Sequence, residues 1–271
     1  MGTQSPRYVS TELQRIAERA RKSPETAFTS IHHHVDLALL REAYRRTRKD
    51  GAVGVDGQTA AAYAENLEGN LQALLDRFKS GQYHAPPVRR KHIPKGDGSN
   101  TRPIGIPTFE DKVLQRAVAL VLEAIYEQDF LDCSYGFRPG RSAHDAIRTL
   151  DQIVHRGEVS WILEADGSLL RLTGKCLHVD VLTGAELSTP ETGTAQGAVL
   201  SPLLGNVMLH SALDLWFETE VKPRLRGRAT LIRYADAAQP ERQGAEARTA
   251  REVPGGALAP RELATGTCAS T

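Results

Sequence analysis

The spacing of apolar residues changes near Tyr83, and this change limits the folds open to the chain more than any other feature. Before it, three stretches place apolar side chains every three or four positions, as amphipathic helices do: residues 11–22, 35–49 and 59–81. After it, residues 88–107 show a strand-and-turn pattern in which Gly96-Asp97-Gly98 supplies the turn of a hairpin. Helical runs return at residues 111–126, 142–153 and 199–215. This order predicts an α+β fold, with helices packed on one side of a small, mostly antiparallel sheet.

The composition is that of an ordinary globular protein. Of its 271 residues, 40% are hydrophobic, which is enough to bury a core. The formal net charge of +1 does not by itself indicate a nucleic-acid-binding protein, so such a surface would have to come from local clusters of Lys and Arg. The cysteines form no zinc or disulfide pattern, and no signal peptide or membrane span is recognisable. We therefore expect a cytoplasmic protein with no membrane partner.

Two aspartates occupy positions suited to metal binding. Asp166 ends the apolar run of residues 161–166, so its carboxylate would emerge where a buried strand ends. Asp236 follows Tyr234 and Ala235 and would provide the partner carboxylate. Mg²⁺ prefers oxygen ligands, and two carboxylates can share two ions in a phosphoryl-transfer site. Considered singly, each aspartate is better explained as a turn residue or a helix cap.

Basic residues gather at the predicted hairpin and in a later loop. Lys95 and Arg102 flank the hairpin turn, where cations could grip phosphates from two sides. A solvated hairpin face is the alternative explanation. Arg138 and Arg141 lie among Gly and Pro residues that would make their loop rigid, although an ordinary surface loop explains them equally well.

Five segments, in this order, resemble the motifs of the reverse transcriptases encoded by group II introns: residues 90–108, 134–144, 161–166, 193–206 and 233–236. Their order makes the resemblance specific, whereas the last motif alone would carry little weight. The resemblance implies a reverse-transcriptase fold of fingers and palm, and an RNA-directed DNA polymerase and maturase. Such a protein extends a DNA primer on an RNA template with dNTPs and binds group II intron RNA. The resemblance also implies two Mg²⁺ ions, held by Asp166 and Asp236.

Seven residues match positions that bind the nucleotide or the template in that family: Lys95, Arg102, Arg138, Arg141, Gln196, Gly197 and Tyr234. Lys95 and Arg102 correspond to positions that hold the incoming triphosphate, and the loop with Arg138 and Arg141 to one near the template backbone. Gln196 belongs beside the primer and the nucleotide, in a loop whose small residues let its backbone approach a strand closely. A turn that precedes a helix is the plain alternative for this loop.

The resemblance divides the chain into four parts. Residues 1–82 are an amino-terminal helical RNA-binding extension, 83–160 the fingers, 161–236 a partial palm and 237–271 a tail. The tail contains few large apolar side chains, so we expect it to be disordered. Its composition changes directly after Asp236, as a frameshift in a GC-rich gene would produce.

The chain also departs from the family pattern. A few tens of residues that should follow Asp166 are deleted, and Ala237 replaces the last acid of the Tyr-Ala-Asp-Asp hairpin. Ala195 and Ala198 replace the usual Pro and Gly of the fourth motif, and the thumb and the maturase region, expected further on, are absent. A catalytic constellation tolerates displacements of only about 0.5 Å, so the deletion would disturb the placement of Asp166.

Three interpretations follow from these matches and departures. The first is an intron-type reverse transcriptase that is truncated, internally deleted and defective. The second is a weak enzyme in which Asp166 and Asp236 alone bind Mg²⁺ and support primer extension. The third is a non-catalytic module that binds intron RNA through its basic helices and fingers, by phosphate contacts and shape.

Overall fold

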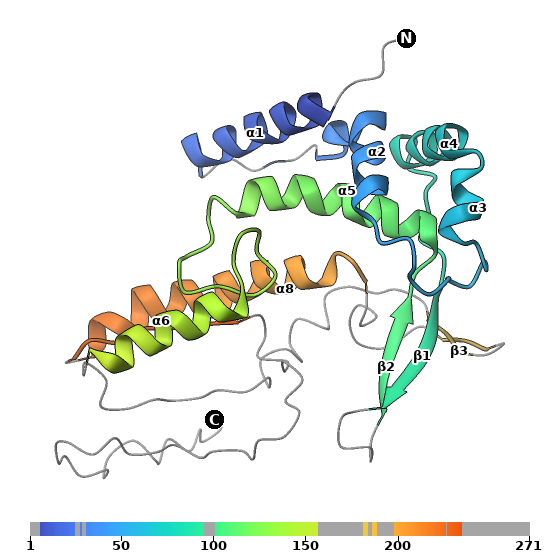
Figure 1. Ribbon diagram of the computed structural model, residues 1–271. Coiled ribbons are helices and arrows are strands. Elements are labelled where there is room, and N and C mark those ends of the chain that lie inside the picture. Colours follow the sequence, from blue (N-terminus) through green and yellow to red (C-terminus); the bar gives the residue numbers. More distant parts are fainter. Residues whose placement is uncertain are drawn as a thin grey trace, which may run out of the picture.

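The computed structural model is α+β, as the sequence predicts (Figure 1). It describes residues 6–24, 28, 31–94, 101–156, 181–183, 186–188, 198–225 and 227–234. The amino-terminal part is helical: α1 (Pro6–Lys22), η1 (Ile31–His34), α2 (Leu37–Arg46), α3 (Ala60–Ala64) and α4 (Leu67–Lys79). Further helices follow the hairpin: α5 (Phe109–Tyr126), α6 (Ala143–His155) and α8 (Ser201–Leu209). The α8 helix continues through π-helical turns η3 (His210–Asp214) and η4 (Phe217–Val221) into the short η5 (Lys222–Arg224).

Four of the helices begin at a residue whose side chain caps the first turn: Asp36 for α2, Thr59 for α3, Thr108 for α5 and Ser142 for α6. Each cap accepts a hydrogen bond from a backbone N–H that has no partner within the helix. Ser142 and Asp145 cap each other's backbone amides, which is the full capping box. Local sequence therefore determines where these helices start.

The single helix expected over residues 59–81 is two helices, so that prediction is wrong in detail. The backbone of Asn66, between α3 and α4, has φ −130° and ψ 51°, which is not helical. The side-chain amide of Asn70 donates a hydrogen bond of 2.9 Å to the carbonyl oxygen of Tyr63. This bond satisfies an acceptor at the end of α3 and supports the break, because side-chain amides compete with the helical ladder.

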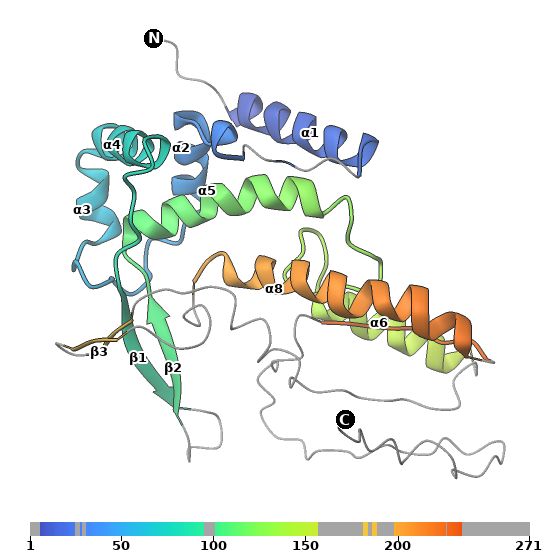
Figure 2. The ribbon, with the colours of Figure 1, turned by 180° about the vertical axis from the view of Figure 1, so that it is seen from behind.

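The predicted hairpin is confirmed. Strands β1 (Val88–Pro94) and β2 (Thr101–Ile106) pair antiparallel, with Arg89 opposite Ile106. Two short strands, β3 (Val181–Thr183) and β4 (Glu186–Ser188), extend the sheet in the order β2-β1-β3-β4, and only the β1–β3 pairing is parallel among the described strands. The hairpin projects from the start of α5, and the helices gather at its end (Figures 1 and 2). The expected layer of helices on one side of the sheet is therefore not seen in the described ranges.

The main core lies around α5, with α1 and α2 against one side of this helix and α8 on the other (Figures 1 and 2). Leu40 of α2, Leu71 of α4 and Val113 of α5 are fully buried there. A smaller cluster of Ala119, Phe130 and Leu203 joins α5 to α8. The α5 helix therefore connects the amino-terminal helices to the part of the chain that carries the later motifs.

Gly54→Ala is expected to lower the free energy of unfolding by about 1 to 3 kcal/mol, because the added methyl group overpacks the contact. A Cβ at Gly54 would lie 2.6 Å from the Cα of Thr108 and 2.9 Å from the carbonyl carbon of Pro107, both of them backbone atoms. Chemical denaturation measures the effect. Gly51→Ala is the matched control, since its Cβ would meet nothing within 4 Å, and an equal loss in both variants would contradict this account.

Candidate functional site

Two segments that are far apart in the sequence meet at Arg233. Its backbone N–H donates a hydrogen bond of 2.7 Å to the carbonyl of Cys133, and its carbonyl accepts one of 2.8 Å from Tyr135. Ser134 and Arg233 thereby form a parallel β-bridge. The loop that follows α5 and the segment that leads into Tyr234 are therefore held side by side.

The side chain of Arg233 adds a third segment. Its Nε and Nη2 atoms donate to the two carboxylate oxygens of Asp214 at 2.8 and 2.7 Å, and Nη1 donates to Oδ1 of Asn206 at 2.8 Å. Nη2 also donates to Oγ of Ser134 at 2.7 Å. The side chains of Arg233 and Asp214 are only 5% and 0% exposed, so this is a buried ion pair. We call Arg233, Asp214, Asn206 and Ser134 the Arg233 cluster.

The helix that runs through residues 201–221 supplies two members of the cluster. Asn206 lies on α8, and its Nδ2 also donates to the carbonyl of Gly136 at 2.7 Å, which fastens the helix to the loop. Asp214 ends the π-helical turn η3, a rare geometry that often occurs at functional sites. Nδ1 of His210 lies 3.9 Å from Asp214, and burial lowers the pKa of this histidine. Arg233, at 2.7 Å, is the closer partner of Asp214.

A chain of hydrogen bonds ties the start of the fourth motif segment to α5. The backbone N–H of Val199 donates to Oε1 of Gln115 at 2.8 Å, and Nε2 of Gln115 donates to Asp111 at 2.8 Å. The hydroxyl of Tyr83 donates to the other carboxylate oxygen of Asp111 at 3.0 Å. Burial raises the pKa of Asp111. Val199, two residues after Gly197, is thus connected through Gln115 and Asp111 of α5 to Tyr83.

Arg138 is buried within the loop. Its guanidinium donates to Glu127 at 2.9 Å and to the carbonyls of Leu131 and Ser134 at 2.8 and 3.0 Å. It also lies 5.1 Å from the ring centre of Phe130. Only 5% of the side chain is exposed, so its donors are directed at the protein. These bonds tie the loop to Glu127 at the end of α5.

Arg141 has a different environment. Its guanidinium pairs with the carboxylate of Asp132 at 2.5 Å and lies 5.3 Å from the ring centre of Tyr135. The side chain of Asp132 is 99% exposed, and a pair of this kind contributes little to stability because water competes for both partners. Nη1 of Arg141 also donates to the backbone carbonyl of Asp132 at 2.8 Å. Phe137, at the same loop, has a positive φ of 54° and is 59% exposed.

The structure places only some of the residues that the sequence singles out. Five of them lie outside the described residues: Lys95, Asp166, Gln196, Gly197 and Asp236. The backbone of Arg102 lies in β2 opposite Ile93, and Tyr234 directly follows the Arg233 cluster and is 37% exposed. In the described part of the chain, no group of three or more His, Cys, Asp or Glu side chains is arranged to hold a metal ion.

Comparison with known proteins identifies the family. Residues 93–169 match the family described as reverse transcriptase (RNA-dependent DNA polymerase). The group II intron-encoded protein LtrA of Lactococcus lactis subsp. cremoris is 31% identical over 225 positions, which cover 73% of this chain and 37% of LtrA. This chain is a relative of group II intron reverse transcriptases and maturases. The predicted resemblance is thereby confirmed.

Two further proteins are similar to this chain. Protein YkfC of Escherichia coli (strain K12) is 39% identical over 186 positions, covering 58% of this chain and 48% of YkfC. Nuclear intron maturase 2 of Arabidopsis thaliana is 28% identical over 209 positions, covering 73% of this chain and 25% of the maturase. The chain spans less than half the length of each of these three relatives.

The alignments with LtrA and YkfC also contain residues that this chain lacks. The alignment with LtrA extends over 225 positions, yet it occupies only 73% of a chain of 271 residues, so it holds more positions than the chain contributes. The alignment with YkfC has the same property, with 186 positions on 58% of the chain. LtrA and YkfC therefore possess segments with no counterpart here.

Sequence reasoning missed the Arg233 cluster, although the signal was present. Asn206 ends the fourth motif segment and Arg233 begins the fifth, so each lies within a stretch that already resembled the family. Ser134 likewise begins the second motif segment, whereas Asp214 lies outside all five segments and carries no comparable signal. None of the helices in the described ranges combines the length and the apolar character that a membrane span needs.

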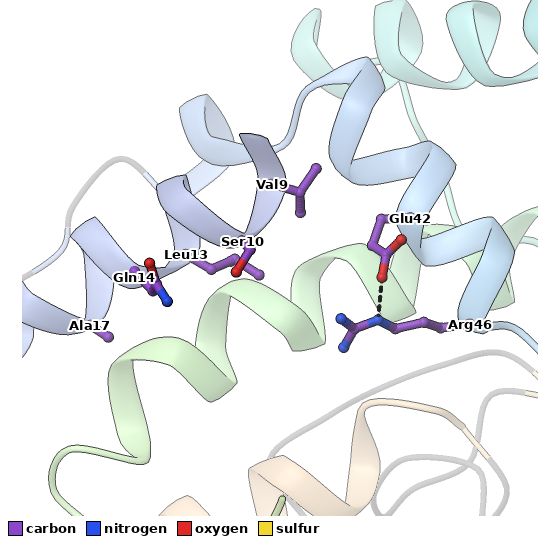
Figure 3. Close-up of a pocket in the computed structure, with 7 residues that line it drawn as sticks. All are labelled: Val9, Ser10, Leu13, Gln14, Ala17, Glu42 and Arg46. Atoms are coloured by element: carbon purple, nitrogen blue, oxygen red, sulfur yellow. Dashed lines mark hydrogen bonds and ion pairs between the residues drawn. The ribbon is translucent and has the colours of Figure 1, made fainter. Parts of the chain in front are cut away.

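A shallow groove of about 250 Å³ lies between α1 and α2, apart from these motifs (Figure 3). It is lined by Val9, Ser10, Leu13, Gln14, Ala17, Glu42 and Arg46. The carboxylate of Glu42 accepts hydrogen bonds of 2.7 Å each from Arg45 and Arg46, and its side chain is 8% exposed. The hydrogen bond from Arg45, together with Arg46, lowers the pKa of Glu42 to about 2.

This pKa predicts an acid-sensitive contribution to stability. Because the folded-state pKa of Glu42 lies below its ordinary value of 4.5, the contribution is present above pH 4.5 and is lost as the pH falls toward 2. Solvent screening of the exposed arginines limits it to about 1 kcal/mol. Urea denaturation at pH 7 and pH 3 should show a smaller acid loss for Glu42→Gln than for the unsubstituted protein. The exposed Glu65→Gln is the control, and an equal acid loss in Glu42→Gln would contradict the prediction.

Proposed function

We propose that this chain is the fingers and partial palm of a group II intron reverse transcriptase, preceded by an RNA-binding extension over residues 1–82, and that this copy is defective in nucleotidyl transfer. The single observation that carries the proposal is the meeting of three motif segments at the Arg233 cluster. The loop of the second motif, the helix of the fourth and the segment of the fifth are held together three residues before Asp236. This arrangement is the framework that a polymerase site requires around one of its acids.

In the proposed site, Asp166 and Asp236 would hold Mg²⁺ through oxygen atoms, the ligands this ion prefers. Bound there, two ions would activate the primer 3′-hydroxyl and stabilise the leaving pyrophosphate. Lys95 and Arg102 would hold the triphosphate of the incoming dNTP by charge-assisted hydrogen bonds. Arg141, whose carboxylate partner Asp132 is exposed, would bind the backbone of the RNA template. The buried Arg138 would support this loop from within.

Gln196, Gly197 and Tyr234 complete the proposed binding surface for nucleotide and template. The hydrogen bond from Val199 to Gln115 supports this assignment for the fourth motif, because it anchors the chain two residues after Gly197. Tyr234 is partly exposed directly beside the Arg233 cluster, where its ring is available to a strand. Group II intron RNA, an RNA template, a DNA primer and dNTPs are the proposed partners.

Two observations support the loss of catalysis. Ala237 stands where the Tyr-Ala-Asp-Asp hairpin would carry its last acid, so one carboxylate is missing. Two relatives possess segments that have no counterpart in this chain, and we assign the missing residues to the stretch after Asp166. Catalytic groups must be held within about 0.5 Å of their productive positions, and loss of supporting structure beneath Asp166 would exceed that tolerance.

Primer extension tests the catalytic part of the proposal. With an RNA template, a DNA primer, dNTPs and Mg²⁺, we expect no product above background. Ala237→Asp should remain equally inactive, since the missing segment is not restored by adding back the acid. Clear dNTP incorporation that disappears in Asp236→Ala would overturn the proposed defect and would show that the two remaining aspartates suffice.

A non-catalytic RNA-binding module is the second candidate. The last turn of α1 carries Arg19, Arg21 and Lys22, and the exposed side of β1 carries Lys91. Phosphate contacts from such residues supply affinity without sequence information and depend steeply on salt. This candidate requires only the amino-terminal helices and the fingers, so it is compatible with a defective polymerase site.

Retention of a structured intron RNA on filters tests the binding module. We expect affinity to fall steeply between 50 and 200 mM salt, roughly as counterion release dictates. The double variant Arg21→Gln and Lys22→Gln should bind more weakly and lower the salt slope by about one for each lost phosphate contact. Lys222→Gln lies outside the amino-terminal helices and the fingers, removes a lysine that is paired with Glu218, and serves as the control. Retention that does not change with salt would reject this candidate.

A further inference from the structure

The Arg233 cluster contains a charged pair whose presence is not explained by stability. Removing two charges from water costs several kcal/mol per ion, and apolar residues of similar volume often replace a buried pair at no loss. Arg233 and Asp214 are nevertheless both buried and bonded through two parallel hydrogen bonds. Such a pair adds geometric specificity, because each hydrogen bond restricts where the guanidinium can lie.

The position of the cluster in the chain indicates which segment the ion pair holds in place. Arg233 is bonded on its backbone to Cys133 and Tyr135, and on its side chain to Ser134 of the same loop and to Asn206 of the helix. Asp236 follows three residues later, at most about 10 Å along an extended chain. A displacement of Arg233 would therefore move Tyr234, the next residue along the chain.

We propose that Arg233 is a positioning residue, which fixes the segment that carries Tyr234, and that leads in sequence to Asp236, against the loop of residues 133–141 and the helix of residues 201–214. Its planar guanidinium reaches Asp214, Asn206 and Ser134 at the same time, so it sets the relative place of all three segments. A lysine at this position would keep the charge but could not form the same fork of hydrogen bonds. The inference rests on the proposed function only for the metal-binding role of Asp236. That Arg233 holds its segment in place is a separate claim.

Hydrogen–deuterium exchange measured by mass spectrometry tests this placement. The informative amides are those of Tyr135 and Arg233, which donate the two backbone hydrogen bonds between the segments. The proteins compared are the unsubstituted chain, Arg233→Lys and the double variant Arg233→Met and Asp214→Leu. The double variant removes both charges of the pair together, so Asp214 is not left as a buried carboxylate without its partner, and the variant is expected to stay folded.

In both variants, the amides of Tyr135 and Arg233 should exchange about tenfold faster or more, while those of α5 keep their protection, because the opening is local. Arg148→Lys, which changes an exposed ion pair on α6, should leave all of these rates unchanged. Unchanged exchange at Tyr135 and Arg233 would overturn the proposal. A uniform increase that includes α5 would also overturn it, since it would show a general structural role.

The choice of variants and of the measurement gives a clear result in every case. If the double variant does not fold, Arg233→Lys alone still tests the proposal, because it retains the positive charge opposite Asp214. The exchange measurement needs no metal, nucleotide or RNA. Unchanged exchange at Tyr135 and Arg233 therefore rejects the positioning role of Arg233 alone. Primer extension and RNA retention test the proposed function separately.

Discussion

Arg233→Met is expected to lower the free energy of unfolding by about 3 to 5 kcal/mol, the cost of leaving a buried charge without its partner. The carboxylate of Asp214 is fully buried and receives two hydrogen bonds from Arg233. Asn206 and Ser134 would lose a donor in the same substitution. Methionine retains much of the volume of the arginine side chain, so the loss would reflect charge and hydrogen bonding rather than a cavity.

Urea denaturation followed by circular dichroism measures this loss. Arg148→Met is the matched control, because Arg148 pairs with Asp145 on the exposed surface of α6. The control should stay within about 0.5 kcal/mol of the unsubstituted protein. A loss below about 1 kcal/mol for Arg233→Met would mean that Asp214 finds another partner. Protonated His210, 3.9 Å away, is the candidate, and that escape should weaken as the pH rises.

Leu40→Ala is expected to cost about 2 to 5 kcal/mol, the sum of lost burial and of the cavity that remains. Leu40 lies on α2 with no exposed surface, inside the core that packs the amino-terminal helices on α5. The neighbouring helices are fixed by their own core residues, so the site can collapse only in part. The same denaturation experiment gives the value.

Ile147→Ala on α6 is the control for this substitution. Its side chain is 63% exposed, so truncation removes little buried surface and should change stability by no more than about 0.5 kcal/mol. Equal losses in the two variants would show that the core around α5 does not provide the main stability of the chain. A large loss for Leu40→Ala together with unchanged exchange at Tyr135 would separate this core from the Arg233 cluster.

Local features of the sequence were sufficient for most of the secondary structure. The α+β order, the hairpin of β1 and β2 and the capped starts of α2, α3, α5 and α6 depend on neighbouring residues alone. The break between α3 and α4 was not predicted, because apolar spacing continues through it. Only the hydrogen bond from Asn70 to the carbonyl of Tyr63 reveals that the helical ladder stops there.

For the candidate site, too, the sequence predicted one part and left another part open. The order of five motifs predicted the relationship to group II intron reverse transcriptases, and the comparisons confirmed it. The roles assigned to Asp166, Asp236 and Lys95 stay predictions, since these residues lie outside the described ranges. For Arg138, the sequence allowed either a phosphate contact or a surface position, whereas the folded chain buries its guanidinium against Glu127.

The amino-acid order by itself determined the helices, the hairpin and the family, because these depend on spacing and on short motifs that are read along the chain. Only the tertiary structure decided which polar side chains meet. Ser134, Asn206, Asp214 and Arg233 come from three segments and converge in one buried cluster. The physical reason is that a buried charge requires a partner at hydrogen-bond distance, and packing, rather than sequence separation, determines which side chain is close enough to serve.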